Sequence, residues 1–153
     1  MKHWIFMFTL LSILWISCSS PEQTETRPDP IGLVWEDLAH VEFEDKYYKD
    51  IDAWMLFPTF GDSLKMLEGK EVFISGYVLT LEPGRYALSA NPFSSCFFCG
   101  GAGPESVLAL ALKDTSAIFY TDEWQTFQGS FRLNDSDVDQ LNYILEDAIV
   151  KDE

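Results

Sequence analysis

The feature that most constrains the fold is a long alternating run at residues 71–82, which reads EVFISGYVLTLE. Apolar side chains at every second position predict a β-strand with one buried face. Gly76 interrupts the alternation, and a glycine inside a strand often marks a bulge or a sharp bend. We therefore expect a long strand that bends near its middle, so that it can pair with strands on both sides of a small barrel.

Further strands are predicted on the C-terminal side of this run. Pro-Gly at 83–84 is a turn signal, and the alternation resumes at 85–91, so the two segments are expected to form a hairpin. Apolar runs at 107–113 and 124–134 predict a third and a fourth strand. Aromatic residues make up 15% of the chain, which suits a β-rich core better than a helical one.

The region before the long strand is less regular. Its pattern predicts a short helix near 35–39 and a strand near 40–46. Pro58 and Gly61 predict a break in any regular element, and one helical turn is expected at 63–67.

The C-terminal segment fits two patterns. Val138, Leu141 and Leu145 follow helical spacing, whereas Leu141, Tyr143 and Leu145 alternate as in a strand. Four strands with a bent first strand and a fifth closing strand predict an all-β fold with minor helix, a small and partly open OB-like barrel of five strands. A β-sandwich, or an α+β fold with a C-terminal helix, is the alternative.

The N-terminus predicts export. It reads MKHWIFMFTLLSILWISC, with one cation, Lys2, before an apolar run. That run is shorter than the roughly 20 apolar residues that span a bilayer. With Ser17 before Cys18, the segment resembles a bacterial lipoprotein signal, which implies cleavage after Ser17 and a lipid on Cys18. Ordinary secretion and an uncleaved anchor are the alternatives.

The rest of the chain divides simply. We expect a signal peptide at 1–17, the lipid-anchor cysteine and a flexible, proline-containing tether at 18–34, and a single domain at 35–153. The protein would then be anchored to a bacterial membrane by lipid, facing the periplasm or the cell surface. The formal net charge is −15, so phosphate backbones repel the chain and nucleic acid is not expected as a partner.

Residues 67–82, LEGKEVFISGYVLTLE, form a motif that is similar to one in other bacterial proteins. Together with the later cysteine-containing loop, they resemble a group of secreted bacterial proteins and lipoproteins of unknown function, with predicted OB-like folds. The resemblance extends over roughly 35–150. It implies a turn at 135–140, a closing strand at 141–149, and an accessory role at the cell envelope beside export or transporter components.

The densest short motif is the loop 94–106, which reads SSCFFCGGAGPES. Cys96 and Cys99 have the C-x-x-C spacing, at which two thiolates can bind one Zn²⁺ or Cu(I) ion. A structural zinc site requires four ligands, and Cys18 is expected to carry lipid. Among the remaining groups of the chain, His40 and carboxylates are the candidates for further ligands.

Two other interpretations of the cysteine pair stay open. In an oxidising compartment Cys96 and Cys99 can form a disulfide that only staples the loop, or they can remain free thiols. Thiol-redox enzymes place C-x-x-C at the start of a helix. Gly100, Gly101 and Pro104 argue against a helix here, so thiol-redox chemistry is the less favoured alternative.

The loop is nevertheless the candidate contact site. Its phenylalanines either cap the barrel as core, which is the preferred interpretation, or form an exposed rim that docks a partner. We expect a binding or accessory module of the envelope that is not an enzyme and has no catalytic residues; a zinc or copper protein is the alternative. The expected contact residues are Phe93, Phe97, Phe98, Gly100, Gly101, Pro104 and Glu105.

Overall fold

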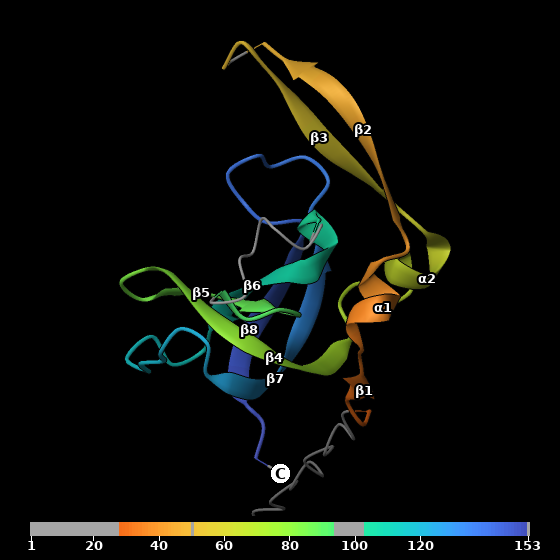
Figure 1. Cartoon of the computed structure of the whole chain (residues 1–153). Coiled ribbons are helices and arrows are strands. Elements are labelled where there is room, and N and C mark those ends of the chain that lie inside the picture. The colour runs from red at the N-terminus through yellow and green to blue at the C-terminus, as the bar shows by residue number, and fades with distance from the viewer. Residues whose placement is uncertain (1–27, 50, 94–102, 153) are drawn as a thin grey trace, which may run out of the picture.

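The computed structural model describes residues 28–49, 51–93 and 103–152, and most of their regular structure is β. Two short α-helices and a 3-10 helix, η2, accompany the strands (Figure 1). The elements in chain order are β1 (Ile31–Gly32), α1 (Trp35–Leu38), β2 (Val41–Tyr48), β3 (Ala53–Phe60), α2 (Asp62–Lys65), β4 (Glu71–Glu82), β5 (Arg85–Ser89), η2 (Pro104–Ser106), β6 (Val107–Leu112), β7 (Trp124–Leu133) and β8 (Tyr143–Val150).

Five of these strands form a closed barrel. The pairing runs from β4 through β5, β6, β8 and β7 and returns to β4, while β1 adds a sixth strand outside the ring. The β6–β8 pairing is parallel, and the other pairings within the ring are antiparallel. The prediction of an all-β, OB-like barrel of five strands is confirmed. The ring is closed rather than partly open, because β4 pairs along both of its edges.

The bend in β4 makes this closure possible. The first part of β4, up to Tyr77, pairs with β7, and the part from Tyr77 onward pairs with β5. Gly76 stands at the crossing, where a Cβ atom would lie 2.6 Å from the carbonyl oxygen of Ser89. The indole of Trp35 covers the same point and donates its Nε1–H to the Ser75 carbonyl oxygen at 2.9 Å. The strands approach so closely here that only glycine fits.

A second close approach occurs between β7 and β8. A Cβ atom on Gly129 would collide with the carbonyl oxygen of Glu146. The register of the two strands shifts between Gln128 and Ser130, which places Gly129 in the irregularity. Such an irregularity increases the local twist that a small barrel needs.

The core fills the barrel and extends under the helices. Val72, Leu88, Leu108 and Phe127 are fully buried inside it. Leu38 of α1 and Leu64 of α2 are also fully buried and belong to the same apolar cluster. The helices therefore complete the core that the strands begin.

Tyr143 fastens α1 to the barrel. Its hydroxyl donates to the carbonyl oxygen of Leu38 at 2.6 Å. Burial, and to a lesser extent the Glu105 carboxylate, raise the pKa of Tyr143 above its ordinary value. The hydroxyl consequently keeps its proton and remains a donor.

Strands β2 and β3 form an antiparallel hairpin that extends beyond the barrel (Figure 1). We call this hairpin the arm. Its root joins the core through Phe60, whose ring lies 5.7 Å from that of Tyr143. The predicted break at Pro58 is wrong, because β3 runs through it to Phe60. A strand at a sheet edge tolerates proline where no ladder hydrogen bond needs the missing N–H.

The fold begins before the expected domain boundary at residue 35, and it ends in the expected closing strand. Ile31 and Gly32 pair with β4, and Leu33 is buried, so residues 31–33 of the expected tether take part in the fold. At the other end β8 is a strand, as the resemblance implied, and its local helical spacing is not realised. In the described part of the chain, no helix is long and apolar enough to cross a membrane.

Two substitutions test the close approaches. Gly76→Ala and Gly129→Ala should each lower the free energy of unfolding by about 1–3 kcal/mol, because the added methyl group forces strands apart. Ser130→Ala, in the same strand as Gly129 and half-buried, should change it by less than about 0.5 kcal/mol. Urea denaturation of the three variants measures these values. Equal stability of the glycine variants and the unchanged protein would contradict this account of the closure.

Candidate functional site

An apolar row crosses the outer face of the barrel. Leu79 of β4, Ala87 of β5, Ala109 of β6 and Ile144 of β8 stand opposite one another in the register of the sheet. An outward-facing row of an antiparallel sheet is normally polar. Leu79, Ala87 and Ile144 are nevertheless buried. This row is therefore the most unusual part of the barrel surface.

Two hollows lie along this face, with volumes of about 530 and 290 Å³. Leu81 and Leu141 line both, so the hollows form one continuous depression, which we call the outer groove. It lies between the β4–β5 turn and the loop 134–142. The residues that define the groove are Leu79, Leu81, Arg85, Ala87, Phe93, Val107, Ala109, Ala111, Leu141 and Ile144.

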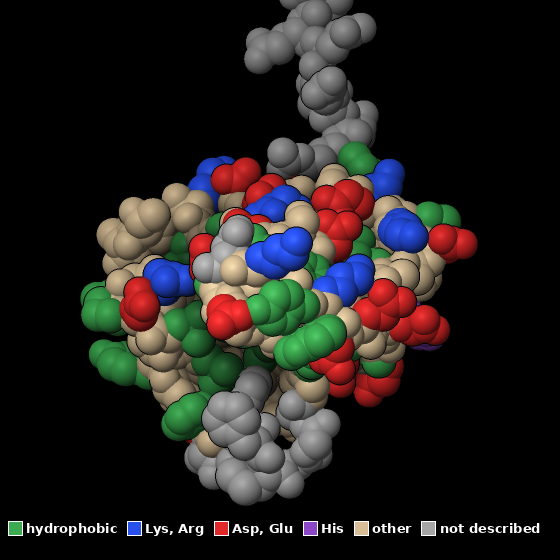
Figure 2. Space-filling model, turned by 90° about the horizontal axis from the view of Figure 1, so that it is seen from above, with side chains coloured by type: hydrophobic (Ala, Val, Ile, Leu, Met, Phe, Trp, Pro, Cys, Tyr) green, Lys and Arg blue, Asp and Glu red, His purple; other side chains and the backbone are tan. Residues whose placement is uncertain are grey.

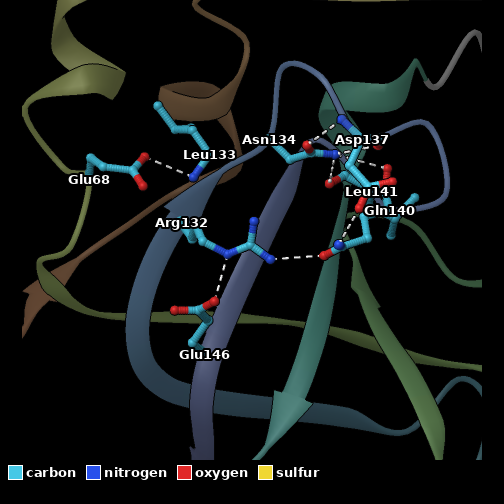
Figure 3. Close-up of polar contacts among 8 residues, drawn as sticks. All are labelled: Glu68, Arg132, Leu133, Asn134, Asp137, Gln140, Leu141 and Glu146. Atoms are coloured by element: carbon cyan, nitrogen blue, oxygen red, sulfur yellow. Dashed lines mark hydrogen bonds and ion pairs between the residues drawn. The ribbon is translucent and has the colours of Figure 1, made fainter.

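One wall of the groove is the loop 134–142, which Asn134 holds from within (Figure 3). The buried Asn134 amide donates to the carbonyl oxygens of Asp137, Gln140 and Leu141, at 2.7, 3.2 and 3.3 Å. Its Oδ1 accepts the N–H of Asp137 at 2.9 Å and that of Ser136 at 3.4 Å. A single side chain thus satisfies the backbone of most of the loop, which fixes the position of Leu141.

Arg132 ties this loop to the barrel. Its Nε–H donates to Glu146 at 2.6 Å, across the β7–β8 pair, and its Nη2 donates to the Gln140 side chain at 2.8 Å (Figure 3). At the end of β7, the N–H of Leu133 donates to the Glu68 carboxylate at 2.8 Å. The wall is therefore formed before any ligand arrives, which lowers the entropic cost of binding.

The residues on either side of the cysteine loop lead into the groove, through Phe93 and Val107. Phe93 lines the smaller hollow, and its N–H donates to the Asp122 carboxylate at 2.5 Å. Its side chain is 59% exposed, so the preferred expectation that it belongs to the core is wrong. At the other end Pro104 and Glu105 are half-buried in η2, and the Ser106 hydroxyl donates to the Gly103 carbonyl oxygen at 2.8 Å.

Of the remaining sequence-predicted site residues, His40 is the one that lies within the described ranges. His40 is exposed, and its Nδ1 lies 3.1 Å from the Asp37 carbonyl oxygen, to which it donates. Among the residues that the structure describes, no three or more His, Cys, Asp or Glu side chains form a cluster that could hold a metal. The metal, disulfide and free-thiol interpretations stay predictions, because the residues outside the described ranges include Cys18, Cys96, Phe97, Phe98, Cys99, Gly100 and Gly101.

Apolar residues form most of the lining of the groove, which also includes Thr115, Asp139 and Gln140. Arg132 is paired with Glu146, and Arg85 lies 3.2 Å from Glu82, so each of these two cations at the groove already has an acidic partner. The outward side chains of β5 and β6 at the row are Ala87 and Ala109, which offer no aromatic face to a base or a sugar ring. Burial of an apolar group here would gain about 25 cal/mol per Å².

Sequence analysis did not identify the groove, although a signal was present. Residues 107–112 read VLALAL, in which the positions of both faces are apolar. A strand with one solvated face should alternate with polar residues, whereas a continuous apolar run indicates that both faces are covered. The outward positions of this run, Val107, Ala109 and Ala111, all line the groove.

The sequence matches no protein-family model, and no curated protein is similar to it. Among solved structures, the fold is similar to that of a DUF3299 family protein from Pseudomonas aeruginosa PAO1. The TM-score is 0.45 and the sequence identity 15%, over 82% of this chain and 98% of that one. That neighbour belongs to an uncharacterised family, and the likeness is too distant to assign a family or an activity. Secretion and lipid attachment stay predictions.

Replacement of the Asn134 side chain, which holds the loop 134–142, tests whether the groove wall is preformed. Asn134→Ala should lower the free energy of unfolding by about 2–3 kcal/mol, because it leaves buried backbone groups without partners. It should also speed amide hydrogen exchange at residues 136–141. Asn142→Ala is the matched control, since that amide makes one hydrogen bond, of 3.3 Å, and should cost less than about 1 kcal/mol. Equal effects of the two substitutions would rule out a special role of Asn134.

Proposed function

We propose that the protein is a lipid-anchored binding module of the bacterial cell envelope, and that its outer groove takes apolar side chains of a partner protein. The observation that carries this proposal is the apolar row Leu79–Ala87–Ala109–Ile144 on a face that would otherwise be polar. A partner can use these residues only through contact, because none of them carries a reactive group. The proposal therefore assigns the protein a role in binding rather than in catalysis.

Charge and shape favour a protein as the ligand of the groove. The net charge of −15 opposes nucleic acid and anionic lipid headgroups. OB-like barrels that bind nucleic acid on this face stack bases on aromatic side chains, and alanines occupy that position here. Small apolar residues between raised walls fit aliphatic or aromatic side chains that insert from a partner.

The lipid anchor rests on the N-terminal sequence. A short cationic start, an apolar run and Ser17 before Cys18 support cleavage and lipid attachment. Residues 18–30 would then separate the membrane from the first paired strand at Ile31. Such a tether keeps the groove close to membrane proteins and raises its effective concentration toward them.

Blocking the groove should abolish binding. We would select a random peptide library displayed on phage against the purified protein, and we expect the enriched peptides to be rich in large apolar residues. Ala111→Trp fills the larger hollow from an exposed position, and it should weaken the selected peptides at least about tenfold, as measured by fluorescence anisotropy.

Ser130→Trp is the control for this experiment, because it places the same side chain on the outer face of β7, away from the groove. It should leave the affinities unchanged. Enrichment of polar peptides, or equal binding by the two tryptophan variants, would show that the groove is not the contact site.

Mass spectrometry can test the anchor directly. When the full chain is produced in a bacterium, the mature protein should lack residues 1–17 and carry a diacylglyceryl group on Cys18, and it should fractionate with membranes. Cys18→Ser should leave the signal uncleaved and the chain without lipid. A mature protein that begins elsewhere, or an unmodified Cys18, would refute lipid anchoring without affecting the groove.

A further inference from the structure

The arm, β2 and β3, is a second surface that is distinct from the outer groove. Its two strands pair with each other, and neither pairs with a strand of the barrel in the described structure. Figure 1 shows the hairpin extending well past the barrel. An isolated two-stranded hairpin is marginally stable in water, and independent stability usually needs a third strand or a packed face. Among the described residues no third strand joins the arm, and Met55, Phe57 and Pro58 border only a hollow of about 170 Å³ that they share with the loop 134–142.

Large apolar side chains are exposed near the tip of the arm. Trp54 is 70% exposed, Leu56 is 52% exposed and Tyr47 is 45% exposed. Tyr47 stands opposite Trp54 in the register, with ring centroids 5.7 Å apart in an edge-to-face arrangement. Figure 2, which looks down on the arm, shows hydrophobic side chains at the surface among acidic ones. Aromatic residues in this setting are typical of contact sites.

Pro58 determines which backbone groups of the arm are free. It stands opposite Phe43, and because proline has no N–H, this must be a pair that exchanges no hydrogen bonds. His40 and Gly61 fit the same alternation, since the Gly61 N–H donates to the His40 carbonyl oxygen at 3.0 Å. In a pair without hydrogen bonds, the N–H and C=O groups point away from the neighbouring strand.

Phe43, Asp45 and Tyr47 therefore direct their backbone N–H and C=O groups along the outer edge of β2. Within the described residues, no other strand pairs with this edge. The outer edge of β3 lacks a donor at Pro58, so it offers a poorer template. An added strand would thus find a continuous ladder of partners at β2.

The side chains of β2 decide what kind of strand fits. Glu42, Glu44 and Asp45 are exposed, and their charge exceeds that of Lys46. Lys46 is itself engaged, because its Nζ lies 3.7 Å from Glu44 and 5.5 Å from the ring centroid of Phe57. Opposite charges on adjacent strands stabilise a pairing, and like charges destabilise it.

Charge also opposes the two simplest occupants. An antiparallel pairing of β2 with a second copy, centred on Asp45, would place the two Asp45 carboxylates opposite each other, in a chain whose net charge is −15. An anionic bilayer surface would meet the same repulsion. We propose that the arm binds an extended, basic segment of another protein, which adds a strand to the free edge of β2 and packs apolar side chains against Tyr47 and Trp54.

Short synthetic peptides test this assignment on the full-length protein. The probe alternates lysine and valine; one control alternates glutamate and valine, and another has the probe sequence with alternate backbone nitrogens methylated. The probe should bind saturably and shift the NMR signals of the Phe43, Asp45 and Tyr47 amides. The glutamate peptide should not bind, and methylation should weaken binding about tenfold because it removes edge hydrogen bonds.

A pair of variants separates the contribution of the backbone hydrogen bond from that of the side-chain charge. Asp45→Pro removes an outward N–H and leaves the β2–β3 ladder intact, so it should weaken the lysine peptide about tenfold. Asp45→Asn removes the same charge but keeps the backbone N–H. Its affinity for the lysine peptide should therefore fall several times less than that of Asp45→Pro. Both variants should retain the circular dichroism spectrum of the unchanged protein.

Several results would overturn the proposal. They are no saturable binding of the lysine peptide, equal binding by Asp45→Pro and Asp45→Asn, and signal shifts confined to the outer groove. Dimerisation that Asp45→Pro abolishes, seen by analytical ultracentrifugation, would assign the edge to a second copy instead. Binding to anionic vesicles through Trp54 would assign the arm to the membrane.

Discussion

The fold depends on one strand that serves two neighbours. β4 pairs with β7 before its bend and with β5 after it, and the bend requires a residue without a side chain at Gly76. Trp35 seals this point and links α1 to β4. Closure of the ring, the attachment of α1 and the alignment of the outer apolar row all follow from this crossing, because each uses the register that β4 imposes.

Most of the barrel could be predicted from local patterns. Alternation located β4 and β5, Gly76 indicated the bend, and the apolar run at 107–113 indicated β6. Other elements could not be found in this way, among them β1, which lies in the expected tether. Pro58 is compatible with β3 only because of its place in the ladder, which is a property of the pair with Phe43. The sequence around β8 fits a helix as well as a strand, and its pairing with β6 and β7 selects the strand.

The candidate site was less accessible to sequence analysis than the fold. The sequence pattern singled out the cysteine loop, and the structure places the residues at its two ends: Phe93, which lines the groove, and η2, which leads into Val107 of the groove. The groove itself is built from β4, β5, β6, β8 and the loop 134–142. Its residues come together only when the ring closes. Alanines such as Ala109 and Ala111 have no reactive or charged group that a sequence pattern could reveal. They matter because their small side chains leave room for the hollow above them.

The position of β8 has a consequence for the order of folding. β8 is the last strand of the barrel in the chain, yet it lies between β6 and β7 and pairs with both. Until these eight residues are available, β6 and β7 each present an unpaired edge, and the ring cannot close. Loss of β8 would therefore leave two unpaired strand edges, which promote aggregation, rather than a slightly smaller barrel. The ring can therefore close only after β8 has been synthesised, and its folding is governed by contacts that are distant in sequence.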